Sequence, residues 1–421
     1  MPTGLMPTGL TAAPRVVIVG AGHGGFQLAA SLRQHGFDGE VLLIGDEPHL
    51  PYQRPPLSKD YLGGKIGLDL LLMRPESFFR DQRIELVGGV AVTEIDRAAK
   101  RLVLADGKRV DYGHLVLATG ARNRVPPLPG VELDGVCYLR NLAETDALKQ
   151  RLAAAEHAVV IGAGFIGLEF AAMARALGAH VHIVELVDRV MSRVVCPETS
   201  AFFADAHRAR GVEFSFGVRV ERIGGEGGRV THLVLDDGRD LPADLVLISI
   251  GVVPNESLAA AAGLAVENGI VVDELLLTAD PAISAIGDCA SFPSRHSQRN
   301  PVRLEAVQNA ADHARCVADR LLRKPAPYAA LPWFWSEQGA LRLQIVGLTA
   351  GFQRVVLRGS PASGGYSAFC YAGDKLLGIE SVNKPADHAF ARRLMAAGRG
   401  VTPAEAADLS FDLRAAATAR L

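Results

Sequence analysis

The sequence predicts an α/β protein made of two similar parallel-sheet domains followed by a C-terminal α+β domain. A strand, a glycine-rich turn and a helix pattern occur in the same order at residues 15–30 and again at 158–174. The segments that follow these two units also resemble each other. A group of short antiparallel strands is expected after a proline-rich linker at 323–327. The 421 residues suffice for two or three domains at ~100–200 residues each.

Each glycine-rich turn has the spacing of a phosphate-binding loop. Residues 15–30 read RVVIVGAGHGGFQLAA, and residues 158–174 read AVVIGAGFIGLEFAAMA. Such glycines allow a tight turn, the close approach of a pyrophosphate and close packing of helix on strand, and the helix N-terminus offers free N–H groups to the phosphates. Both units are therefore predicted to be Rossmann-like dinucleotide-binding domains. The glycines are Gly20, Gly22 and Gly25 in the first unit and Gly162, Gly164 and Gly167 in the second.

The repeat extends beyond the glycine turns. A second apolar strand closes each unit, at 41–47 and at 180–186, and residues 101–126 resemble residues 231–255. Both of the latter segments carry an Asp-Gly hairpin signal followed by an apolar strand that ends in glycine. An internal duplication of this kind predicts two bound dinucleotides rather than one.

An acidic residue at the end of the second strand predicts which dinucleotide binds. Glu185 lies 18 residues after Gly167, where a carboxylate accepts hydrogen bonds from a ribose 2′-OH and repels a 2′-phosphate. We therefore expect NADH rather than NADPH in the second unit, although Arg189 and Arg193 could partly offset the repulsion. In the first unit glycine occupies this position, and the carboxylate is displaced to Asp46.

A third signal lies at residues 278–290, which read TADPAISAIGDCA. A strand that ends in Gly287-Asp288 places a carboxylate at a helix start, and residues 302–321 continue as a strand followed by a helix. Asp288 could be a simple helix N-cap or a ligand contact, and the two roles are compatible.

Over almost its whole length the sequence resembles the FAD-dependent, NADH-using ferredoxin reductases of the putidaredoxin reductase type, which have a glutathione-reductase-like fold. The resemblance rests on VVIVGAGHGG, LIGDEPHLPYQRPPLSKDYL, LVLATGARNR, YLRNL, VVIGAGFIGLEFA, ADLVLISIGVVPN, AIGDCA and PWFWSEQG. RPPLSKDYL and PWFWSEQ are the most specific. The resemblance implies electron transfer from NADH through FAD to a [2Fe–2S] ferredoxin, which supplies a cytochrome P450 or a ring-hydroxylating oxygenase.

The resemblance also implies contacts for individual residues. FAD is expected to contact Gly20, Gly22, Gly24, Gly25, Asp46, Arg54, Lys59, Val92, Ala118, Arg140, Asp288 and Val307. NADH is expected to contact Gly162, Gly164, Phe165, Ile166, Glu185, Arg193, Gly251 and, through its carboxamide, Glu305.

Three residues are expected to act at the reacting end of the flavin. In the family a lysine at the position of Lys59 approaches flavin N5 beside a glutamate of the NAD-binding helix, which here is Glu169. We expect Lys59 at the start of a helix and in an ion pair with Glu169, because a buried lysine is costly unless it is paired. The resemblance puts Trp335 beside the isoalloxazine at the ferredoxin surface. The alternative is that Trp333 and Trp335 share one face of an ordinary buried strand.

The cysteines separate this sequence from related flavoproteins. Disulfide reductases of the fold carry a pair of cysteines against the flavin, and related NADH peroxidases and oxidases carry one. Here residues 51–59 read PYQRPPLSK and the first cysteine is Cys137, so no thiol is expected near the flavin. Without a thiol relay the electrons must leave for an external acceptor. The remaining cysteines are Cys196, Cys289, Cys316 and Cys370.

Composition excludes several other classes. With 44 basic and 46 acidic residues the net charge is −2, and no long basic run indicates nucleic-acid or membrane-surface binding. No apolar stretch reaches the ~18 residues of a membrane span, and no signal peptide is expected. Scattered cysteines argue for a reducing cytoplasm, and neither the cysteines nor the 12 histidines have metal-site spacing.

The domain boundaries follow from these signals. We expect the FAD-binding domain at 1–115 and 248–325, the NAD-binding domain at 116–247 and the C-terminal domain at 326–421. In the C-terminal domain strands are expected at 341–348, 352–359, 366–373 and 375–382, then a helix at about 385–397 and a loose alanine-rich tail. Candidate side chains for docking an acidic ferredoxin are Arg295, Arg299, Arg303 and Arg342.

The sequence leaves open three alternatives to a ferredoxin reductase. A rubredoxin reductase and an NADH oxidase would use the same scaffold. A flavoprotein that senses NADH and binds partners would be favoured by a basic surface, long insertions or targeting segments, and the sequence shows none of these.

Overall fold

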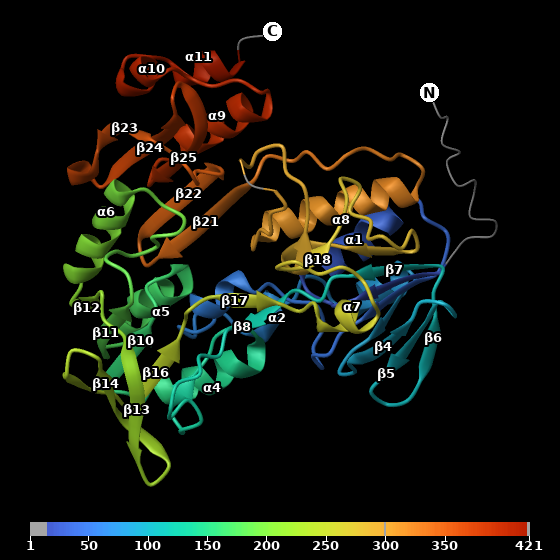
Figure 1. Cartoon of the computed structure of the whole chain (residues 1–421), viewed down its shortest axis with the longest axis horizontal. Coiled ribbons are helices and arrows are strands. Elements are labelled where there is room, and N and C mark those ends of the chain that lie inside the picture. Colours follow the sequence, from blue (N-terminus) through green and yellow to red (C-terminus); the bar gives the residue numbers. More distant parts are fainter. Residues whose placement is uncertain (1–14, 299, 419–421) are drawn as a thin grey trace.

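The computed structural model describes residues 15–298 and 300–418, which form three bodies of helices and strands in contact with one another (Figure 1). The first body holds the N-terminal strands together with the gold segment that precedes helix α8. The second body, in green, carries the repeat of the motif. The C-terminal body, in red-brown, lies against the second through strand β21 and helix α5. The α/β fold with two Rossmann-like domains and a C-terminal α+β domain is confirmed.

The first body contains a five-stranded parallel sheet in the order β19-β7-β1-β2-β3. Strand β1 is fully buried, as expected for a sheet covered on both faces. Helices α1 and α8 pack together over this sheet, and an antiparallel sheet β4-β5-β6 contributes to the same core. The elements are β1 (Val16–Val19), α1 (His23–Gln34), β2 (Val41–Ile44), β3 (Ile84–Val87), β4 (Val92–Asp96), β5 (Arg101–Leu104), β6 (Arg109–Asp111), β7 (His114–Leu117), β19 (Ile283–Ala285) and α8 (Val307–Leu321).

The second body repeats this plan with a parallel sheet in the order β12-β11-β10-β16-β9. One face of β10 packs with helices α4, α5 and α6, and the other face packs with the antiparallel sheet β13-β14-β15. The elements are β9 (Val136–Cys137), α4 (Leu142–Leu152), β10 (His157–Ile161), α5 (Phe165–Ala176), β11 (His180–Glu185), α6 (Pro197–Arg208), β12 (Val212–Phe216), β13 (Val220–Glu226), β14 (Arg229–Leu235), β15 (Asp240–Pro242) and β16 (Leu245–Ile248).

Two short antiparallel strands, β8 (Ala121–Asn123) and β17 (Val252–Pro254), pair where the chain passes between the first and second bodies. The boundary predicted between 115 and 116 falls inside β7, and the boundary predicted between 247 and 248 falls one residue before β16 ends. Both boundaries thus fall inside strands rather than in connections, and the three predicted domain ranges stay predictions.

The C-terminal body is an antiparallel sheet in the order β21-β22-β25-β24-β23. The sequence predicted four of these strands and helix α9 to within about two residues at each end. The elements are β21 (Trp333–Gln338), β22 (Leu341–Gly347), β23 (Arg354–Ser360), β24 (Gly365–Ala372), β25 (Lys375–Val382), α9 (Pro385–Ala396), α10 (Pro403–Ala407) and α11 (Leu413–Thr418).

The prediction of a loose tail after α9 is wrong. Helix α10 begins with a capping box, in which Thr402 and Glu405 satisfy each other's backbone N–H groups. Helix α11 packs against α9, and it buries Leu413 and Ala417, which lie four residues apart on one helix face.

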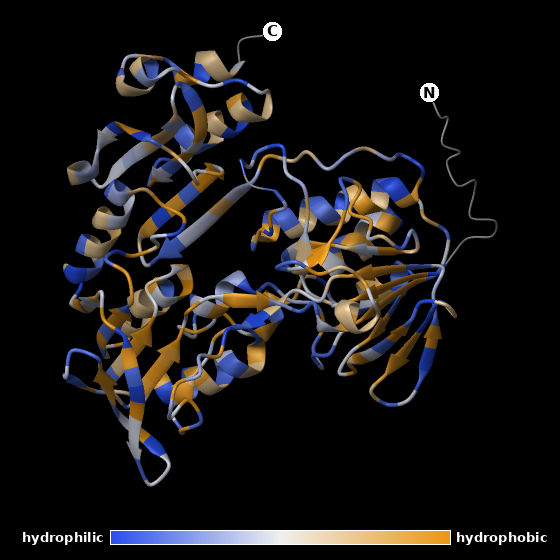
Figure 2. Ribbon diagram, viewed as in Figure 1, coloured by the Kyte–Doolittle hydropathy of each residue, from blue (hydrophilic) through white to orange (hydrophobic). Residues whose placement is uncertain are grey.

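The remaining elements are short and lie mostly in connections. They are the helical turns η1 (Pro55–Ser58), η2 (Gly287–Cys289) and η3 (Pro361–Ser363), the helices α2 (Leu68–Leu71), α3 (Glu76–Asp81) and α7 (Ser257–Ala261), and the strands β18 (Ile270–Val271) and β20 (Ala290–Ser291). Hydrophobic residues concentrate in the strands of the central sheets (Figure 2). Among the described residues no helix combines the length and apolar character that a membrane span requires.

Candidate functional site

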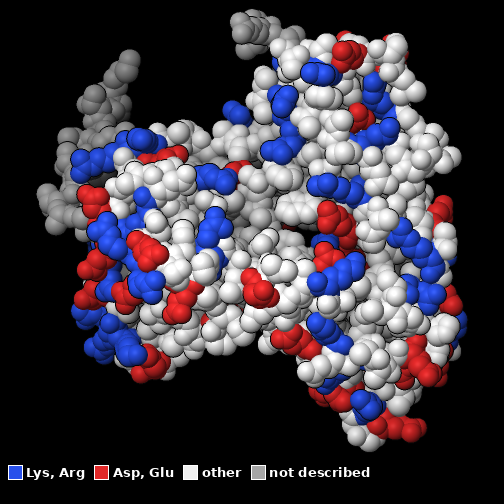
Figure 3. All heavy atoms as spheres, turned by 180° about the vertical axis from the view of Figure 1, so that it is seen from behind, with Lys and Arg blue, Asp and Glu red and all other residues white. Residues whose placement is uncertain are grey.

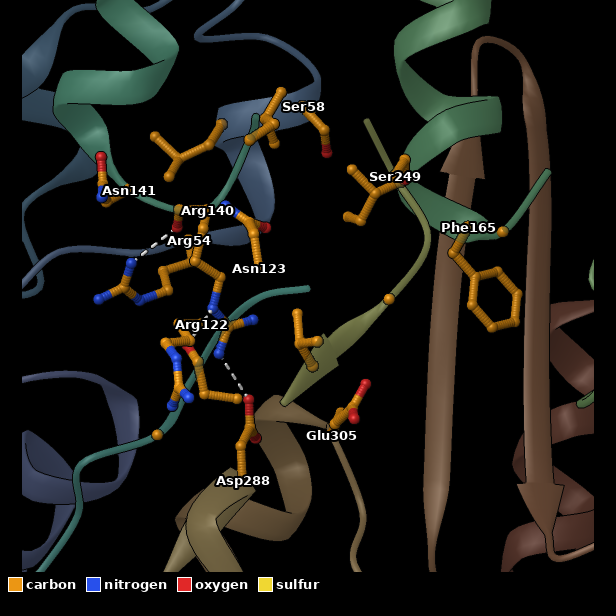
Figure 4. A pocket seen from close by; sticks show the side chains of 18 of the residues that line it. Arg54, Ser58, Arg122, Asn123, Arg140, Asn141, Phe165, Ser249, Asp288 and Glu305 are labelled. Carbon is orange, nitrogen blue, oxygen red and sulfur yellow. Dashed lines mark hydrogen bonds and ion pairs between the residues drawn. The ribbon is translucent and has the colours of Figure 1, made fainter. Parts of the chain in front are cut away.

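A cavity of about 1000 Å³ lies between the two repeats and is bordered by strand β21. This volume is at the upper end of the range for small-molecule sites. Both glycine turns, the ends of β7 and β16, the β8–β17 pair and the start of α8 contribute to its wall. Figure 4 shows some of the lining side chains, among them Asn123, Ser249 and Phe165. The carboxyl ends of the parallel strands in both sheets thus face one common space, where ligands of such sheets bind.

The first glycine turn fits a phosphate that approaches the backbone. Gly20 has a φ of +111°, and a Cβ there would lie 2.1 Å from the carbonyl oxygen of Ala118. A Cβ at Gly25 would lie 1.9 Å from the carbonyl oxygen of Gly20, so this glycine lets helix α1 pack on the turn. At Gly22, just before α1, no atom lies within 4 Å of an added Cβ. The start of α1 is therefore open to the cavity.

The second turn has the same design. Gly162 has a φ of +105°, with the carbonyl oxygen of Ser249 2.5 Å from an added Cβ, and Gly167 packs against the carbonyl of Gly162. The space at Gly164, before α5, is again open. Two equivalent helix N-termini therefore offer N–H groups to the same cavity.

The acidic residues that the sequence singled out lie at these turns. Glu185 lines the cavity, and its Oε2 accepts the backbone N–H of Ala163 at 2.7 Å. The guanidinium of Arg189 donates to the carbonyl oxygens of Ser192 and Val195 in its own loop, so it is turned to the backbone rather than to the cavity. Asp46 is exposed and also lines the cavity.

A network of charges organises the half of the cavity next to η2. Asp288 and Arg140 form an ion pair of 2.8 Å, and Arg140 also donates to the carbonyl of Ala121 (Figure 4). Arg54 donates to the carbonyl oxygen of Arg140 at 2.7 Å and pairs with Glu47 at 2.6 Å. The sequence predicted three members of this network but not how they connect.

Several residues at this end of the cavity were not anticipated. Glu47 accepts a hydrogen bond of 2.5 Å from Tyr52, whose hydroxyl in turn accepts the backbone N–H of Leu142. His23, inside the first glycine motif, lies among charged groups. Burial and then the charge of Arg54 lower the pKa of His23 to about 4, so its ring is neutral at neutral pH. The only sequence signal for these roles was their place within segments already recognised, the first glycine motif for His23 and LIGDEPHLPYQRPPLSKDYL for Glu47 and Tyr52.

The predicted ion pair between Lys59 and Glu169 is confirmed. Lys59 Nζ lies 2.8 Å from Glu169 Oε2, and the two side chains are 17% and 4% exposed. Helix α5 presents Glu169 toward the turn that carries Lys59. The expectation that Lys59 starts a helix is wrong. It follows the short turn η1, because Pro55 and Pro56 favour a brief helical turn at their own positions and Lys59 leaves helical geometry.

Strand β21 presents aromatic side chains on both faces. The rings of Trp333 and Trp335 lie 5.5 Å apart, as expected for residues two apart on a strand, whereas Phe334 packs on Phe165 at 4.6 Å. Trp335 is half-buried and lines the cavity.

The other predicted contact residues divide into two groups. Glu305 lines the cavity and pairs with Arg303 at 2.8 Å. Gly25 lies beneath the first turn and Val92 begins strand β4; neither lines the cavity, and their contacts to a ligand stay predictions. The cavity wall includes all of the remaining predicted residues, namely Gly20, Gly22, Gly24, Asp46, Arg54, Lys59, Ala118, Arg140, Gly162, Gly164, Phe165, Ile166, Glu169, Glu185, Arg193, Gly251, Asp288, Val307 and Trp335.

All five cysteines lie in the described part of the chain, and none of them lines the cavity. Cys137 is buried, and burial raises the pKa of its thiol to about 11, which keeps it protonated. Cys196 and Cys370 lie near Glu380 in a buried group between α6 and the C-terminal sheet, and the Glu380 carboxylate accepts the backbone N–H of Cys196 there. A thiol relay to the cavity is therefore not built into this site.

The four arginines proposed for ferredoxin docking differ in their exposure to solvent. Arg295 and Arg342 are exposed, and Arg299 lies outside the described residues. The side chain of Arg303 is only 8% exposed, because it pairs with Glu305 and donates to the carbonyl of Asp288. Its prediction as an exposed docking side chain is wrong. Several basic side chains lie on the C-terminal body in the view from behind (Figure 3).

The two glycine turns face one cavity, and each has a carboxylate at or just after its second strand. This arrangement defines an oxidoreductase that binds two dinucleotides. The residues present fit FAD at the first turn and NAD(H) at the second. Comparison with known proteins agrees with this class. The chain belongs to the pyridine nucleotide-disulphide oxidoreductase family, whose model matches residues 14–314, and residues 333–417 match the reductase C-terminal family. It is an FAD-dependent enzyme that uses NAD(H).

Individual relatives are similar over nearly their whole length. Rhodocoxin reductase from Rhodococcus erythropolis is 50% identical over 401 residues, which cover 95% of this chain and 94% of that protein. The crystal structure of the ferredoxin reductase for the CYP199A2 system from Rhodopseudomonas palustris matches with a TM-score of 0.94 and 56% identity, covering 96% of this chain and 100% of that chain. The covalent putidaredoxin reductase–putidaredoxin complex matches with a TM-score of 0.93 and 40% identity, covering 96% and 98%.

A rubredoxin-NAD(+) reductase from Ectopseudomonas oleovorans is also similar, at 36% identity over 375 residues, which cover 88% of this chain and 96% of that protein. The chain is therefore similar both to ferredoxin reductases and to a rubredoxin reductase, with higher identity to the ferredoxin reductase from Rhodopseudomonas palustris than to this rubredoxin reductase.

Proposed function

We propose that this protein is an NADH-dependent reductase of a [2Fe–2S] ferredoxin that supplies a cytochrome P450 or a ring-hydroxylating oxygenase. The observation that carries the proposal is the two-dinucleotide cavity whose wall contains no cysteine. Such a site can accept a hydride but cannot pass electrons to a thiol pair of its own chain. The similarity to ferredoxin reductases supports an external iron–sulfur acceptor. Free, mostly buried cysteines support a cytoplasmic location.

Bound FAD would accept a hydride from NADH and return single electrons, and the hydride transfer itself needs no acid or base from the protein. Gly22 and Gly24 would lie against its pyrophosphate, and Asp288 and Arg140 against its central chain. Lys59, held by Glu169, would place a positive charge at the reacting end of the flavin. On the other side Gly164, Phe165 and Ile166 would bind NADH. The chain's main tasks are to align the two rings and to exclude water.

The two alternatives on the same scaffold differ in where the electrons go. An NADH oxidase would pass them to oxygen, and a rubredoxin reductase would pass them to a one-iron protein. Higher identity to ferredoxin reductases than to the rubredoxin reductase favours the [2Fe–2S] partner. A partner-binding NADH sensor lacks support, because the described residues contain no long insertion beyond the two matched families.

Coenzyme choice is the first testable expectation. The Glu185 carboxylate is fixed at the second glycine turn by the N–H of Ala163, and Arg189 is bound to its own loop. We therefore expect kcat/KM for NADH to exceed that for NADPH by at least about tenfold, because a 2′-phosphate meets the Glu185 carboxylate. Of the two arginines that could offset this repulsion, only Arg193 lines the cavity. Glu185→Ser should lower the ratio of kcat/KM for NADH to kcat/KM for NADPH, mainly through a higher KM for NADH. A wild-type preference for NADPH would contradict the role of Glu185.

The second expectation concerns Trp335 and the transfer of electrons to ferredoxin. Trp335→Ala should slow reduction of a [2Fe–2S] ferredoxin by about tenfold, the size typical of an interface tryptophan, while reduction of FAD by NADH stays within about twofold. Stopped-flow absorbance separates the two steps. Trp333→Ala is the matched control, because Trp333 lies on the same face of β21 but does not line the cavity. Equal slowing of both steps by Trp335→Ala would assign this residue to the core instead.

A further inference from the structure

The Glu169 carboxylate is held by hydrogen-bond donors from two distant parts of the chain. Its Oε2 accepts Lys59 Nζ at 2.8 Å and the hydroxyl of Ser58 at 2.5 Å, both from the turn before α2. Its Oε1 accepts the hydroxyl of Ser336 at 2.7 Å, from strand β21 of the C-terminal sheet. Both serines are buried. Each oxygen of a carboxylate that is nearly inaccessible to solvent thus has a specific donor, as a buried charge requires.

The Ser336 hydroxyl is itself oriented by a buried network. Gln338 Nε2 approaches Ser336 Oγ at 3.4 Å and Met191 Sδ at 3.6 Å, and Gln338 Oε1 pairs with His207 Nε2 at 2.8 Å. Because the amide oxygen must accept, His207 is assigned the tautomer that donates from Nε2. Ser336 therefore accepts from Gln338 and gives its single proton to Glu169. The polar chain runs from α6 through β21 to the Lys59–Glu169 pair.

The geometry of Lys59 depends on this carboxylate. An ammonium group has three N–H donors. Lys59 Nζ gives one to Glu169 at 2.8 Å and one to the carbonyl oxygen of Pro55 at 3.1 Å, and Lys59 lines the cavity. One donor is thus left for a group in the cavity, and its direction is fixed by the other two. A rotation of the Glu169 carboxylate would turn that donor away.

We propose that Ser336 is a positioning residue that fixes Glu169 and, through it, the charge of Lys59 in the cavity. The inference rests on the function proposed above, in which Lys59 faces the reacting end of the flavin. Because successive strand residues point to opposite faces, β21 sends Trp335 to the cavity wall and Ser336 to Glu169. A single strand thereby joins the C-terminal body to the step that reduces the flavin.

The test uses the holoenzyme and the variant Ser336→Ala. We expect hydride transfer from NADH to slow roughly tenfold, in keeping with a lost hydrogen bond to a charged group. The midpoint potential of bound FAD should fall, because a displaced Lys59 stabilises the reduced form less. A tenfold decrease in the equilibrium constant for reduction of the bound flavin corresponds to about 30 mV for a two-electron couple. Ser367→Ala is the matched control. Ser367 is buried in the same sheet and bonded to Ser381 and Asp387, so rate and potential should stay unchanged.

A double-mutant cycle shows whether Ser336 acts through Glu169. In a Glu169→Gln background, Ser336→Ala should have little further effect on rate or potential. The same loss in both backgrounds would overturn the proposal. If Ser336→Ala does not fold, Ser336→Thr and Ser336→Val test the role of the hydroxyl, because the two side chains share a shape and only threonine keeps the hydroxyl. Ser336→Thr should retain the wild-type midpoint potential of FAD, and Ser336→Val should lower it. If Glu169→Gln alone changes neither quantity, the assignment of the ion pair to the flavin fails instead.

Discussion

Replacing Asp288 with alanine should weaken FAD binding at least about thirtyfold, because truncating one partner of a hydrogen-bonded charge pair in a binding interface costs about 2–5 kcal/mol. The Asp288–Arg140 pair is partly buried in the cavity wall. Asp288 holds Arg140 at 2.8 Å, and Arg140 in turn fixes the end of β8 and accepts a hydrogen bond from Arg54. The variant therefore loses its own contact to the flavin and leaves a guanidinium without its carboxylate beside the binding site. The measurement is FAD titration of the apoprotein by flavin fluorescence.

A matched carboxylate separates this effect from general loss of stability. Asp280 lies in the same body and pairs with Arg97 at 2.9 Å, but it does not line the cavity. Asp280→Ala should lower the thermal unfolding midpoint and leave the dissociation constant of FAD within about twofold of wild type. Unchanged FAD affinity in Asp288→Ala would contradict the assignment of the first glycine turn and η2 to the flavin.

Lys59→Met is the variant with the second large effect. It removes the cation from Glu169, whose side chain is 4% exposed, and breaking a buried pair in this way costs about 3–5 kcal/mol of unfolding free energy. Hydride transfer from NADH should also slow roughly a hundredfold, the typical cost of removing one fixed electrostatic group from a reacting centre. Urea unfolding of the holoenzyme measures the first quantity, and stopped-flow flavin reduction measures the second.

Two further variants distinguish the structural role of Lys59 from its role at the flavin. Lys65 forms an exposed pair with Asp60 at 3.4 Å, and Lys65→Met should cost less than about 1 kcal/mol, with no change in rate. In the double variant Lys59→Met, Glu169→Gln no unpaired charge is buried, so most of the stability should return while hydride transfer stays slow. Recovery of the rate together with the stability would show that Lys59 acts only through folding.

The sequence predicted the elements whose constraints are local. The glycines of both turns must be glycines because a Cβ at Gly20 or Gly162 would collide with the backbone of the neighbouring strand. Such a constraint is visible as a spacing in the sequence, and it places the strand before and the helix after the turn. The resemblance added the Lys59–Glu169 pair, which joins residues that are 110 positions apart and which no local pattern could reveal.

The features that the sequence did not reveal are long-range or depend on burial. Ser336 meets Glu169 only because the C-terminal sheet packs on α5, and a serine in a strand carries no signal of its partner. Arg303 was expected as an exposed docking side chain because it lies close to the flavin motifs in the sequence, but Glu305 and the carbonyl of Asp288 hold it in a buried position. The helix after Thr402 was overlooked because its capping residues were counted as part of an alanine-rich tail.

On the proposed function, electrons from NADH leave this chain for a separate [2Fe–2S] protein. NADH-driven reduction of cytochrome c by the purified yellow holoenzyme, measured with and without a [2Fe–2S] ferredoxin, tests it most directly. We expect the rate to rise at least about tenfold when ferredoxin is added, with little oxygen consumption in its absence, because no thiol lines the cavity to take the electrons. Rapid oxygen consumption that does not depend on ferredoxin, or a larger response to rubredoxin than to ferredoxin, would show that a [2Fe–2S] protein is not the acceptor.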